Sequence, residues 1–243
     1  MPGKANRWTG RFADHVAVGL AECARFFGHK PVTVTGTPVR AVLRGGKVAN
    51  ARERLGLDPE RTTVLVAGGS QGAHAVNVAM ANALKWLNGQ ARKVQFVHLS
   101  GLCDEQFMRE EYERNGYEAK VMSFCDQMEL AYSAADFVVA RSGASTLTEL
   151  AAFGLPAIMI PFPQAAGNHQ WHNARVFERA GAGHMIEQSQ LNGLQEPTGQ
   201  RLADVIGGLV EDEMQRQRMA EAARSLAVND ASERIATLVE TYG

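Results

Sequence analysis

The stretch ARSGASTLTELAAFGLPAIMIPFPQAAGNHQWHNA, from Ala140 to Ala174, decides the fold. It contains the end of an apolar strand, a glycine turn, a helix, a second apolar strand and a polar loop. Thr146 and Glu149 lie three residues apart, as in a capping box, and Ser145 is the expected N-cap of this helix.

The glycine turn in this stretch has the features of a ligand site. Ser142, Gly143 and Ala144 are small enough for the backbone to approach a ligand closely. A helix N-terminus that points out of a parallel sheet is a ready site for phosphate. The Glu149 carboxylate, expected in the first turn, can reach sugar hydroxyls. The residues therefore predict one half of a nucleotide-sugar site.

From Thr62 onward, short β-branched runs alternate with helical patterns. The expected strands are Thr62–Gly68, Val94–Ser100, Lys120–Phe124, Asp136–Gly143, Pro156–Phe162 and Gly183–Glu187. The expected helices are about Ala73–Trp86, about Glu105–Arg114, a short one capped by Asp126, Thr146 onward, and a helical tail from about Gly199. Strands that are apolar on both faces and alternate with helices predict an α/β fold, with a parallel sheet covered on each side.

The first residues follow a different pattern. Several apolar residues there fall near helical spacing, namely Phe12, Val16, Leu20 and Cys23, together with His15. They predict an amphipathic helix followed by the strand PVTVTG, without a strand ahead of that helix. A break at Gly36–Pro38 then predicts a hinge, so the chain is expected to start inside one α/β domain and to continue into a complete second one.

Composition excludes several classes of function. Of the 243 residues, 21% are charged and the formal net charge is −1. This balance lacks the excess of positive charge that is typical of proteins that bind nucleic acid. Cys23, Cys103 and Cys125 lack metal-ligand or CxxC spacing, and we expect no metal and no cofactor. No run approaches the ~18 apolar residues of a membrane span. The first twelve residues, MPGKANRWTGRF, lack the apolar core of a signal peptide. We expect a cytoplasmic protein.

Two motifs leave alternatives open. The segment GGSQGA, Gly68–Ala73, suits either a phosphate or ribose cradle or simply a tight turn between strand and helix. Arg40, just after Pro38 in TPVR, is either a pyrophosphate partner or a solvated surface residue.

The remaining polar candidates also have structural alternatives. Glu149 can be a helix cap, and His169, Gln170 and Asn173 can be a polar loop with capping duties. We expect His98 to be a core histidine in its strand. The sequence contains no convincing catalytic nucleophile.

Taken together, the segments resemble the MurG family of glycosyltransferases. The matching segments are PGKANR, TGTPVR, VLVAGGSQGAHAVN, SFCDQMELAYSAADFVVARSGASTLTEL, GLPAIMIPFP and HQWHNA, in the order and spacing of the family. The resemblance implies a GT-B architecture, in which two Rossmann-like domains face each other across a cleft. It also implies transfer of GlcNAc from UDP-GlcNAc to undecaprenyl-pyrophosphoryl-MurNAc-pentapeptide, which converts lipid I into lipid II.

The resemblance assigns roles to individual residues. Arg40 is similar to the arginine near the donor diphosphate, and Ser70 to the serine of the Gly-rich loop. Cys125 takes the place of an aliphatic residue whose backbone reads uracil, and Glu149 resembles the carboxylate that binds ribose. His169 and Gln170 fall where the family presents polar groups to GlcNAc. The full set of expected UDP-GlcNAc-binding residues is Arg40, Gly69, Ser70, Gln71, Cys125, Ser142, Gly143, Ala144, Thr146, Glu149, His169, Gln170 and Asn173.

The chain departs from the family pattern at three places. Thr37 stands where the family usually has Asn, and Gly167 stands where an acidic residue is common. No GTGGH-like loop occurs, and in the family that loop carries the His proposed for catalysis. We therefore expect the catalytic residues in an N-terminal domain that is mostly absent, either because the chain is a fragment or because a second chain carries that domain.

This interpretation divides the chain into three parts. Residues 1–36 are the expected remnant of the N-terminal acceptor domain with the hinge, residues 37–228 the UDP-sugar-binding domain, and residues 229–243 a helix that crosses back. The expected location is peripheral, at the inner face of the cell membrane. The alternatives are a non-catalytic UDP-sugar-binding subunit of a split glycosyltransferase, or a GT-B glycolipid synthase with another acceptor.

Overall fold

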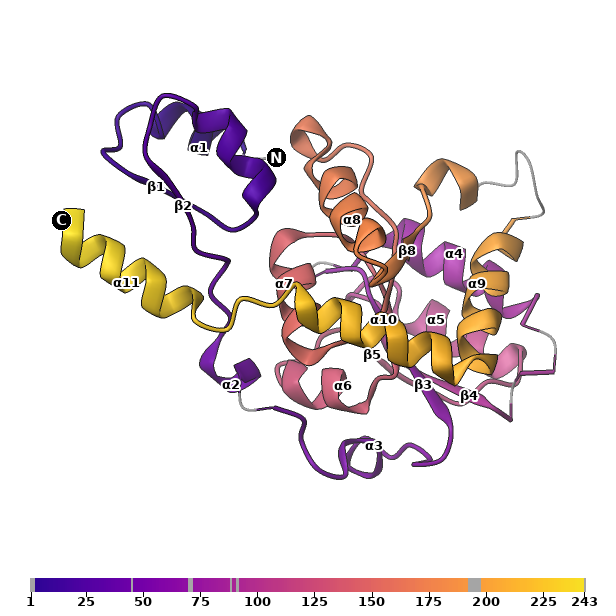
Figure 1. Ribbon diagram of the computed structural model, residues 1–243. Coiled ribbons are helices and arrows are strands. Elements are labelled where there is room, and N and C mark those ends of the chain that lie inside the picture. Colours follow the sequence, from indigo (N-terminus) through magenta and orange to yellow (C-terminus); the bar gives the residue numbers. More distant parts are fainter. Residues whose placement is uncertain are drawn as a thin grey trace.

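The computed structural model of the chain describes residues 3–44, 46–69, 72–87, 89–90, 92–191 and 198–242 (Figure 1). Within these residues lie a six-stranded and a two-stranded sheet, both entirely parallel. None of the helices in these ranges combines the length and the apolarity needed to cross a bilayer.

The larger sheet has the strand order β5-β4-β3-β6-β7-β8. Its strands are β3 (Thr62–Ala67), β4 (Val94–Leu99), β5 (Ala119–Met122), β6 (Phe137–Ala140), β7 (Ala157–Met159) and β8 (Gly183–Met185). The six expected strands are all present, and the predicted α/β fold is confirmed. All six end earlier than expected, because the residues after each strand turn away to form the loops at the carboxyl edge.

Helices cover both faces of this sheet, as Figure 1 shows. On β3, Val64 and Val66 belong to one apolar core, and Leu65 between them belongs to the other. The first core is completed by α4 (His74–Leu84), α5 (Glu105–Arg114) and α9 (Gln200–Glu211). The second is completed by α6 (Met128–Ala134), α7 (Ala144–Phe153), α8 (His169–Arg179) and α10 (Glu213–Ser225). Burial on both faces explains why these strands are apolar throughout rather than alternating.

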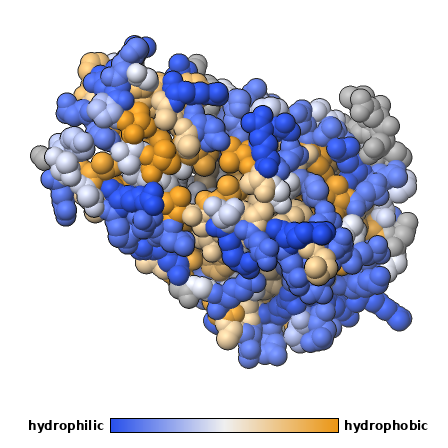
Figure 2. All heavy atoms as spheres, viewed as in Figure 1, coloured by the Kyte–Doolittle hydropathy of each residue, from blue (hydrophilic) through white to orange (hydrophobic). Residues whose placement is uncertain are grey.

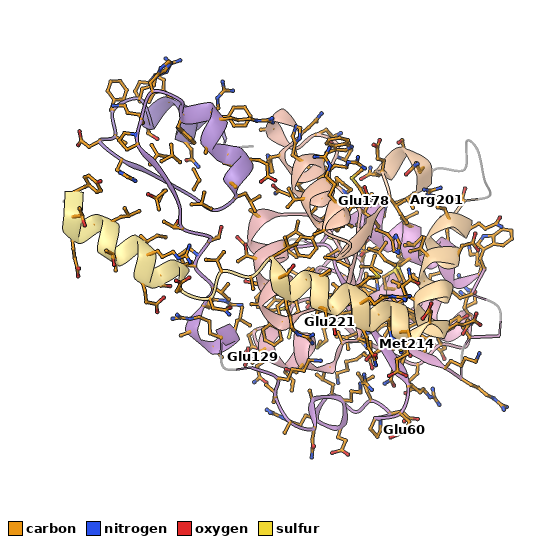
Figure 3. All side chains as sticks on the ribbon, in the orientation of Figure 1. Glu60, Glu129, Glu178, Arg201, Met214 and Glu221 are labelled. Carbon is orange, nitrogen blue, oxygen red and sulfur yellow. The ribbon has the colours of Figure 1, made fainter. Side chains whose placement is uncertain are left out.

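Short helices occupy several connections. They are α2 (Ala41–Arg44), α3 (Ala51–Arg54), and the 3₁₀ turns η2 (Ala166–Asn168) and η3 (Gln188–Leu191). Glu178, labelled in Figure 3, links α8 to β8. Its Oε1 accepts a hydrogen bond from the Met185 amide at 3.1 Å, and its Oε2 accepts one from Arg175 Nη1 at 2.5 Å. This link fixes the last strand under the helix that precedes it.

The N-terminal unit, residues 3–34, corrects a sequence prediction. The expected helix through Phe12–Cys23 is absent, and the chain there forms β1 (Val16–Val18) and the 3₁₀ helix η1 (Ala21–Phe27), preceded by α1 (Lys4–Thr9). β1 pairs in parallel with β2 (Val32–Val34), so a strand does precede β2. The β-branched Val16 and Val18 favour a strand. Their apparent helical spacing with Leu20 and Cys23 spans two different elements.

The C-terminal helix α11 (Ala231–Tyr242) returns to this N-terminal unit (Figure 1). The Tyr242 ring stacks on His15 with the centroids 4.5 Å apart. Arg234 Nη1 lies 3.4 Å from the Val34 carbonyl. Apolar side chains gather where the N-terminal unit faces the rest of the molecule (Figure 2). The last helix therefore contacts the N-terminal unit.

Candidate functional site

The candidate site lies at the carboxyl edge of the larger sheet, where the strand order reverses. The chain runs outward through β3, β4 and β5 and then returns to place β6 beside β3. Ala67 and Ala140, the last residues of β3 and β6, are in register. The Gly-rich loop and the Ser142–Ala144 turn therefore leave the sheet side by side. In open α/β sheets such a switch point is where ligands bind.

The loop after β3 needs its glycines for close backbone packing. A Cβ on Gly72 would lie 2.4 Å from the Ser100 carbonyl oxygen, and one on Gly68 would lie 2.5 Å from the Ala73 nitrogen. Gly69 has a φ of +106°, a conformation that L side chains rarely adopt. Ser70 and Gln71 lie outside the described residues. The loop leads into α4, whose first N–H groups face the same edge.

The turn after β6 leads directly into α7, and its details correct the expected capping. The N-cap is Gly143, whose extended backbone starts the helix at Ala144, and Ser145 lies inside the first turn. No side chain caps this helix, so the capping box of Thr146 and Glu149 does not form. Glu149 lies in the second turn rather than the first. The first N–H groups of α7 lack intrahelical acceptors and carry the positive end of the helix dipole.

Glu149 has a partner that the sequence did not indicate. Tyr132 on α6 donates a hydrogen bond from Oη to Glu149 Oε2 at 2.7 Å. Burial raises the pKa of Tyr132, the Glu149 carboxylate raises it further, and Arg40 acts in the opposite direction. Cys125 also raises the pKa of Tyr132. Glu149 therefore contacts a buried tyrosine, and Cys125 packs against the apolar core to which that tyrosine belongs.

The beginning of α8 is hydrogen-bonded to the turn after β6. Ser142 Oγ donates to the Gln170 carbonyl at 2.8 Å, and Asn173 Nδ2 donates to the Ser142 carbonyl at 3.1 Å. Gln170 Oε1 accepts from the Phe162 amide at 2.9 Å, and His169 Nδ1 donates to the Ala166 carbonyl at 2.8 Å. These bonds leave Gln170 Nε2 and His169 Nε2 as the groups that can bind a ligand.

Arg141 is a buried residue at this edge that sequence reasoning missed. Its Nη1 donates to the carbonyls of Ile160 and Pro161, at 3.0 and 3.2 Å. Its Nη2 donates to Gln188 Oε1 at 2.8 Å. Burial lowers the pKa of the guanidinium. Arg141 thereby joins the ends of β6 and β7 to η3. The available signal was a cation that directly follows an apolar strand.

A second buried polar group lies behind the Gly-rich loop and confirms His98 as a core histidine. His98 is fully buried, and burial lowers its pKa to about 3. Asn77 Nδ2 donates to the Ser100 carbonyl at 2.8 Å and to Asp104 at 2.7 Å, so its Oδ1 is the acceptor for His98 Nε2 at 3.0 Å. His98 Nδ1 then accepts from Tyr112 Oη at 3.0 Å. The histidine is neutral and holds β4 to α4 and α5.

The structure locates the predicted site residues other than Ser70 and Gln71. Gly69, Ser142, Gly143, Ala144 and Thr146 line the two neighbouring turns, and His169, Gln170 and Asn173 begin α8 beside them. Arg40 is exposed, and its charge lowers the pKa of Tyr132. Within the described ranges, no group of three or more His, Cys, Asp and Glu side chains forms a metal-binding cluster.

Comparison with protein families gives a match over most of the chain. Residues 63–235 match the model of the glycosyltransferase family 28 C-terminal domain. The UDP-N-acetylglucosamine–N-acetylmuramyl-(pentapeptide) pyrophosphoryl-undecaprenol N-acetylglucosamine transferase of Citrifermentans bemidjiense is 39% identical over 97% of this chain and 63% of that relative. The protein of the same name from Geobacter sp. strain M21 is 38% identical over 99% of this chain and 62% of its own length. The chain thus spans less than two thirds of these relatives.

Solved structures agree with the fold. The crystal structure of Acinetobacter baumannii MurG has a TM-score of 0.74 and 26% identity, and covers 99% of this chain and 64% of its own. The Staphylococcus aureus MnaA–UDP structure has a TM-score of 0.63 and covers 96% of this chain and 62% of its own. At 16% identity the latter likeness shows the fold alone.

Proposed function

Because this chain belongs to glycosyltransferase family 28, whose C-terminal domain it carries, we propose that it provides the UDP-GlcNAc site of a GlcNAc transferase. The acceptor is the lipid-linked MurNAc-pentapeptide, as the names of the relatives suggest, and the reaction converts lipid I into lipid II. The observation that carries the proposal is the adjacency of two uncapped helix N-termini and the Glu149 carboxylate at the switch point of the sheet.

The proposed donor pose follows from this geometry. The diphosphate lies at the N-termini of α4 and α7, where free N–H groups and the helix dipoles favour negative charge. Arg40 adds a cation on the same side. Glu149 receives the ribose hydroxyls, and the backbone near Cys125 receives uracil. Gln170 and His169 face the sugar through the nitrogens that their own hydrogen bonds leave free.

The proposed chemistry is an inverting displacement. The C4 hydroxyl of MurNAc attacks the anomeric carbon of GlcNAc, its proton passes to a general base, and UDP leaves. This chain stabilises the charge that grows on the departing diphosphate, through the two helix N-termini and Arg40. We assign the base to the part of the relatives that this chain does not span.

The test is calorimetric titration of the full 243-residue chain with UDP and with UDP-GlcNAc, followed by a transfer assay on lipid I. We expect both nucleotides to bind, and transfer only after addition of a chain that carries the part of the relatives that this chain does not span. Failure of both nucleotides to bind would contradict the proposed donor site. Transfer by the chain alone would contradict the assignment of the base.

We further propose that residues 1–36 complete an acceptor domain with a second polypeptide segment, on the same chain or on another. The support is β1 with β2, a two-stranded parallel sheet that is too small to be stable alone. Residues 37–228 then form the donor domain, and residues 229–243 cross back. Co-purification of the chain with a separately expressed acceptor segment, and loss of that complex on replacing Val16 with Asp, tests this assignment.

The location proposed is peripheral, at the inner face of the cell membrane, because the acceptor is lipid-linked. Trp8 and Phe12, 62% and 73% exposed, meet edge to face beside Arg7 and Arg11. Aromatic and basic side chains together favour an anionic lipid surface. Flotation with anionic vesicles tests this location. Trp8→Ala should reduce binding, whereas Trp86→Ala, which alters an exposed tryptophan beyond α4, should not.

A further inference from the structure

We propose that Tyr132 is a positioning residue of the nucleotide site: its hydroxyl orients the Glu149 carboxylate to receive the ribose hydroxyls of a uridine nucleotide. The inference rests on the proposed function, since it requires that Glu149 faces the ribose. The observation behind it is the 2.7 Å hydrogen bond from Tyr132 Oη to Glu149 Oε2. Glu149 has no other side-chain partner among the described residues.

The tyrosine is held rigidly enough to do this. Tyr132 is only 3% exposed, and the centroid of its ring lies 5.2 Å from the ring centroid of Phe153 on α7. It belongs to the apolar core beneath α6 and α7, together with Leu150. A ring packed in this way cannot change rotamer without opening the core. The hydroxyl is therefore fixed in space. The Glu149 side chain is partly exposed, so without the hydrogen bond from Tyr132 it could adopt several rotamers.

The direction of the hydrogen bond leaves acceptor capacity for the ligand. An ionised carboxylate only accepts, so the tyrosine donates its single proton to Oε2. Burial and the neighbouring carboxylate raise the pKa of Tyr132, which keeps that proton on the hydroxyl. A carboxylate offers about four lone-pair sites. One bond to Tyr132 sets its plane and leaves Oε1 and one site of Oε2 for the two hydroxyls of a ribose.

The surroundings of Tyr132 point to the same place. Cys125 packs against the apolar core to which Tyr132 belongs, and the Arg40 charge lowers the pKa of Tyr132. Arg40 is proposed to contact the diphosphate, and the backbone at Cys125 is proposed to contact uracil. A ribose lies between diphosphate and base in a uridine nucleotide. The tyrosine therefore lies beneath the position where the ribose of such a ligand must be.

The test compares two tyrosine-to-phenylalanine variants of the full chain. Tyr132→Phe removes only the hydroxyl that reaches Glu149. Tyr117→Phe is the matched control, because Tyr117 is also buried and donates its hydroxyl proton to a backbone carbonyl, that of Leu87, away from the site. Affinities for UDP and 2′-deoxy-UDP are measured by calorimetry, alongside thermal unfolding. Tyr132→Phe is also measured in a chain that already carries Glu149→Ala.

We expect Tyr132→Phe to weaken UDP about tenfold and to narrow the ratio of UDP to 2′-deoxy-UDP affinity, because the carboxylate loses its orientation. Tyr117→Phe should keep the wild-type affinity and ratio. In the Glu149→Ala background, Tyr132→Phe should have no further effect, because the two residues act as one unit.

Two results would overturn the inference alone. In the first, Tyr132→Phe keeps the wild-type UDP affinity and the wild-type ratio of UDP to 2′-deoxy-UDP affinity, although Glu149→Ala lowers both. The other is an equal loss in Tyr132→Phe and Tyr117→Phe, which would make the effect structural. Failure of the wild-type chain to bind UDP is a separate outcome, because it overturns the proposed function and the inference together.

Discussion

Asn173 holds Ser142 in place across the candidate site: its Nδ2 donates to the Ser142 carbonyl at 3.1 Å. Both residues are buried, at 4% and 0% exposure. Ser142 in turn donates its hydroxyl proton to the Gln170 carbonyl. The turn proposed to face the phosphates and the helix proposed to face the sugar are therefore one hydrogen-bonded piece. A substitution in the turn should therefore displace the helix, and a substitution in the helix should displace the turn.

Replacing Asn173 with Ala should lower the free energy of unfolding by about 1–3 kcal/mol, because it leaves the buried Ser142 carbonyl unpaired. It should also weaken UDP-GlcNAc. The measurements are denaturant unfolding and calorimetry. Asn115→Ala is the control, since Asn115 Nδ2 also donates to a backbone carbonyl, that of Glu111, but far from the site. Equal effects of the two variants on UDP-GlcNAc affinity would contradict the prediction.

Gln170→Ala should weaken UDP-GlcNAc more than UDP, by about tenfold, because only the sugar nucleotide presents hydroxyls to Gln170 Nε2. Gln170 also accepts from the Phe162 amide, so some loss of stability is expected in addition. Comparing the two ligands separates these effects, since a structural effect acts on both affinities. Equal losses for UDP and UDP-GlcNAc would place Gln170 away from the sugar.

Gly72→Ala should cost at least about 3 kcal/mol of unfolding free energy, because it combines a left-handed backbone with a clash. Gly72 has a φ of +73°, and a Cβ there would lie 2.4 Å from the Ser100 oxygen. Gly181 has a φ of +79° and open space around it, so Gly181→Ala should cost only about 1–2 kcal/mol. Thermal or denaturant unfolding measures the difference, and similar costs would show that the close contact with Ser100 is unimportant.

Arg141→Met should destabilise the chain by about 3 kcal/mol, because several buried acceptors lose their donor. The loss should also loosen the loop after β7 and reduce UDP-GlcNAc affinity. Arg201, exposed on α9 and labelled in Figure 3, provides the control. Arg201→Met should leave the unfolding free energy within about 0.5 kcal/mol. An Arg141 variant as stable as this control would mean that other groups hold the ends of β6 and β7 and the turn η3 together.

The stability of the chain should fall below neutral pH, in part through His98. Its folded pKa is about 3, below the ordinary 6.5, so the unfolded state binds the proton first as the pH drops. The contribution is complete above about pH 6.5 and is lost progressively toward pH 3. From pH 7 to pH 5 the loss is about 2 kcal/mol.

Unfolding of a His98→Gln variant at several pH values measures this contribution. The variant should lack that part of the pH dependence, although it is less stable overall. His29→Gln, at an exposed position, should retain the wild-type slope. An unchanged slope in His98→Gln would show that other groups dominate the acid sensitivity.

The sequence alone was sufficient for the larger sheet. Runs such as Thr62–Ala67 and Phe137–Ala140 are β-branched or apolar on both faces, and only a strand between two helical layers buries them completely. Local composition decides these features, since burial on two faces leaves few other solutions.

The tertiary structure decided what local pattern cannot. Val16–Val18 became a strand because β2 was available to pair with it, although its neighbours have helical spacing. The hydrogen bond from Tyr132 to Glu149 joins residues 17 positions apart on two helices, and Arg141 reaches carbonyls 19 and 20 positions away. Such contacts depend on how layers pack and on which polar groups need partners once water is excluded. These contacts leave no pattern within a single segment, so the periodicity of the sequence cannot predict them.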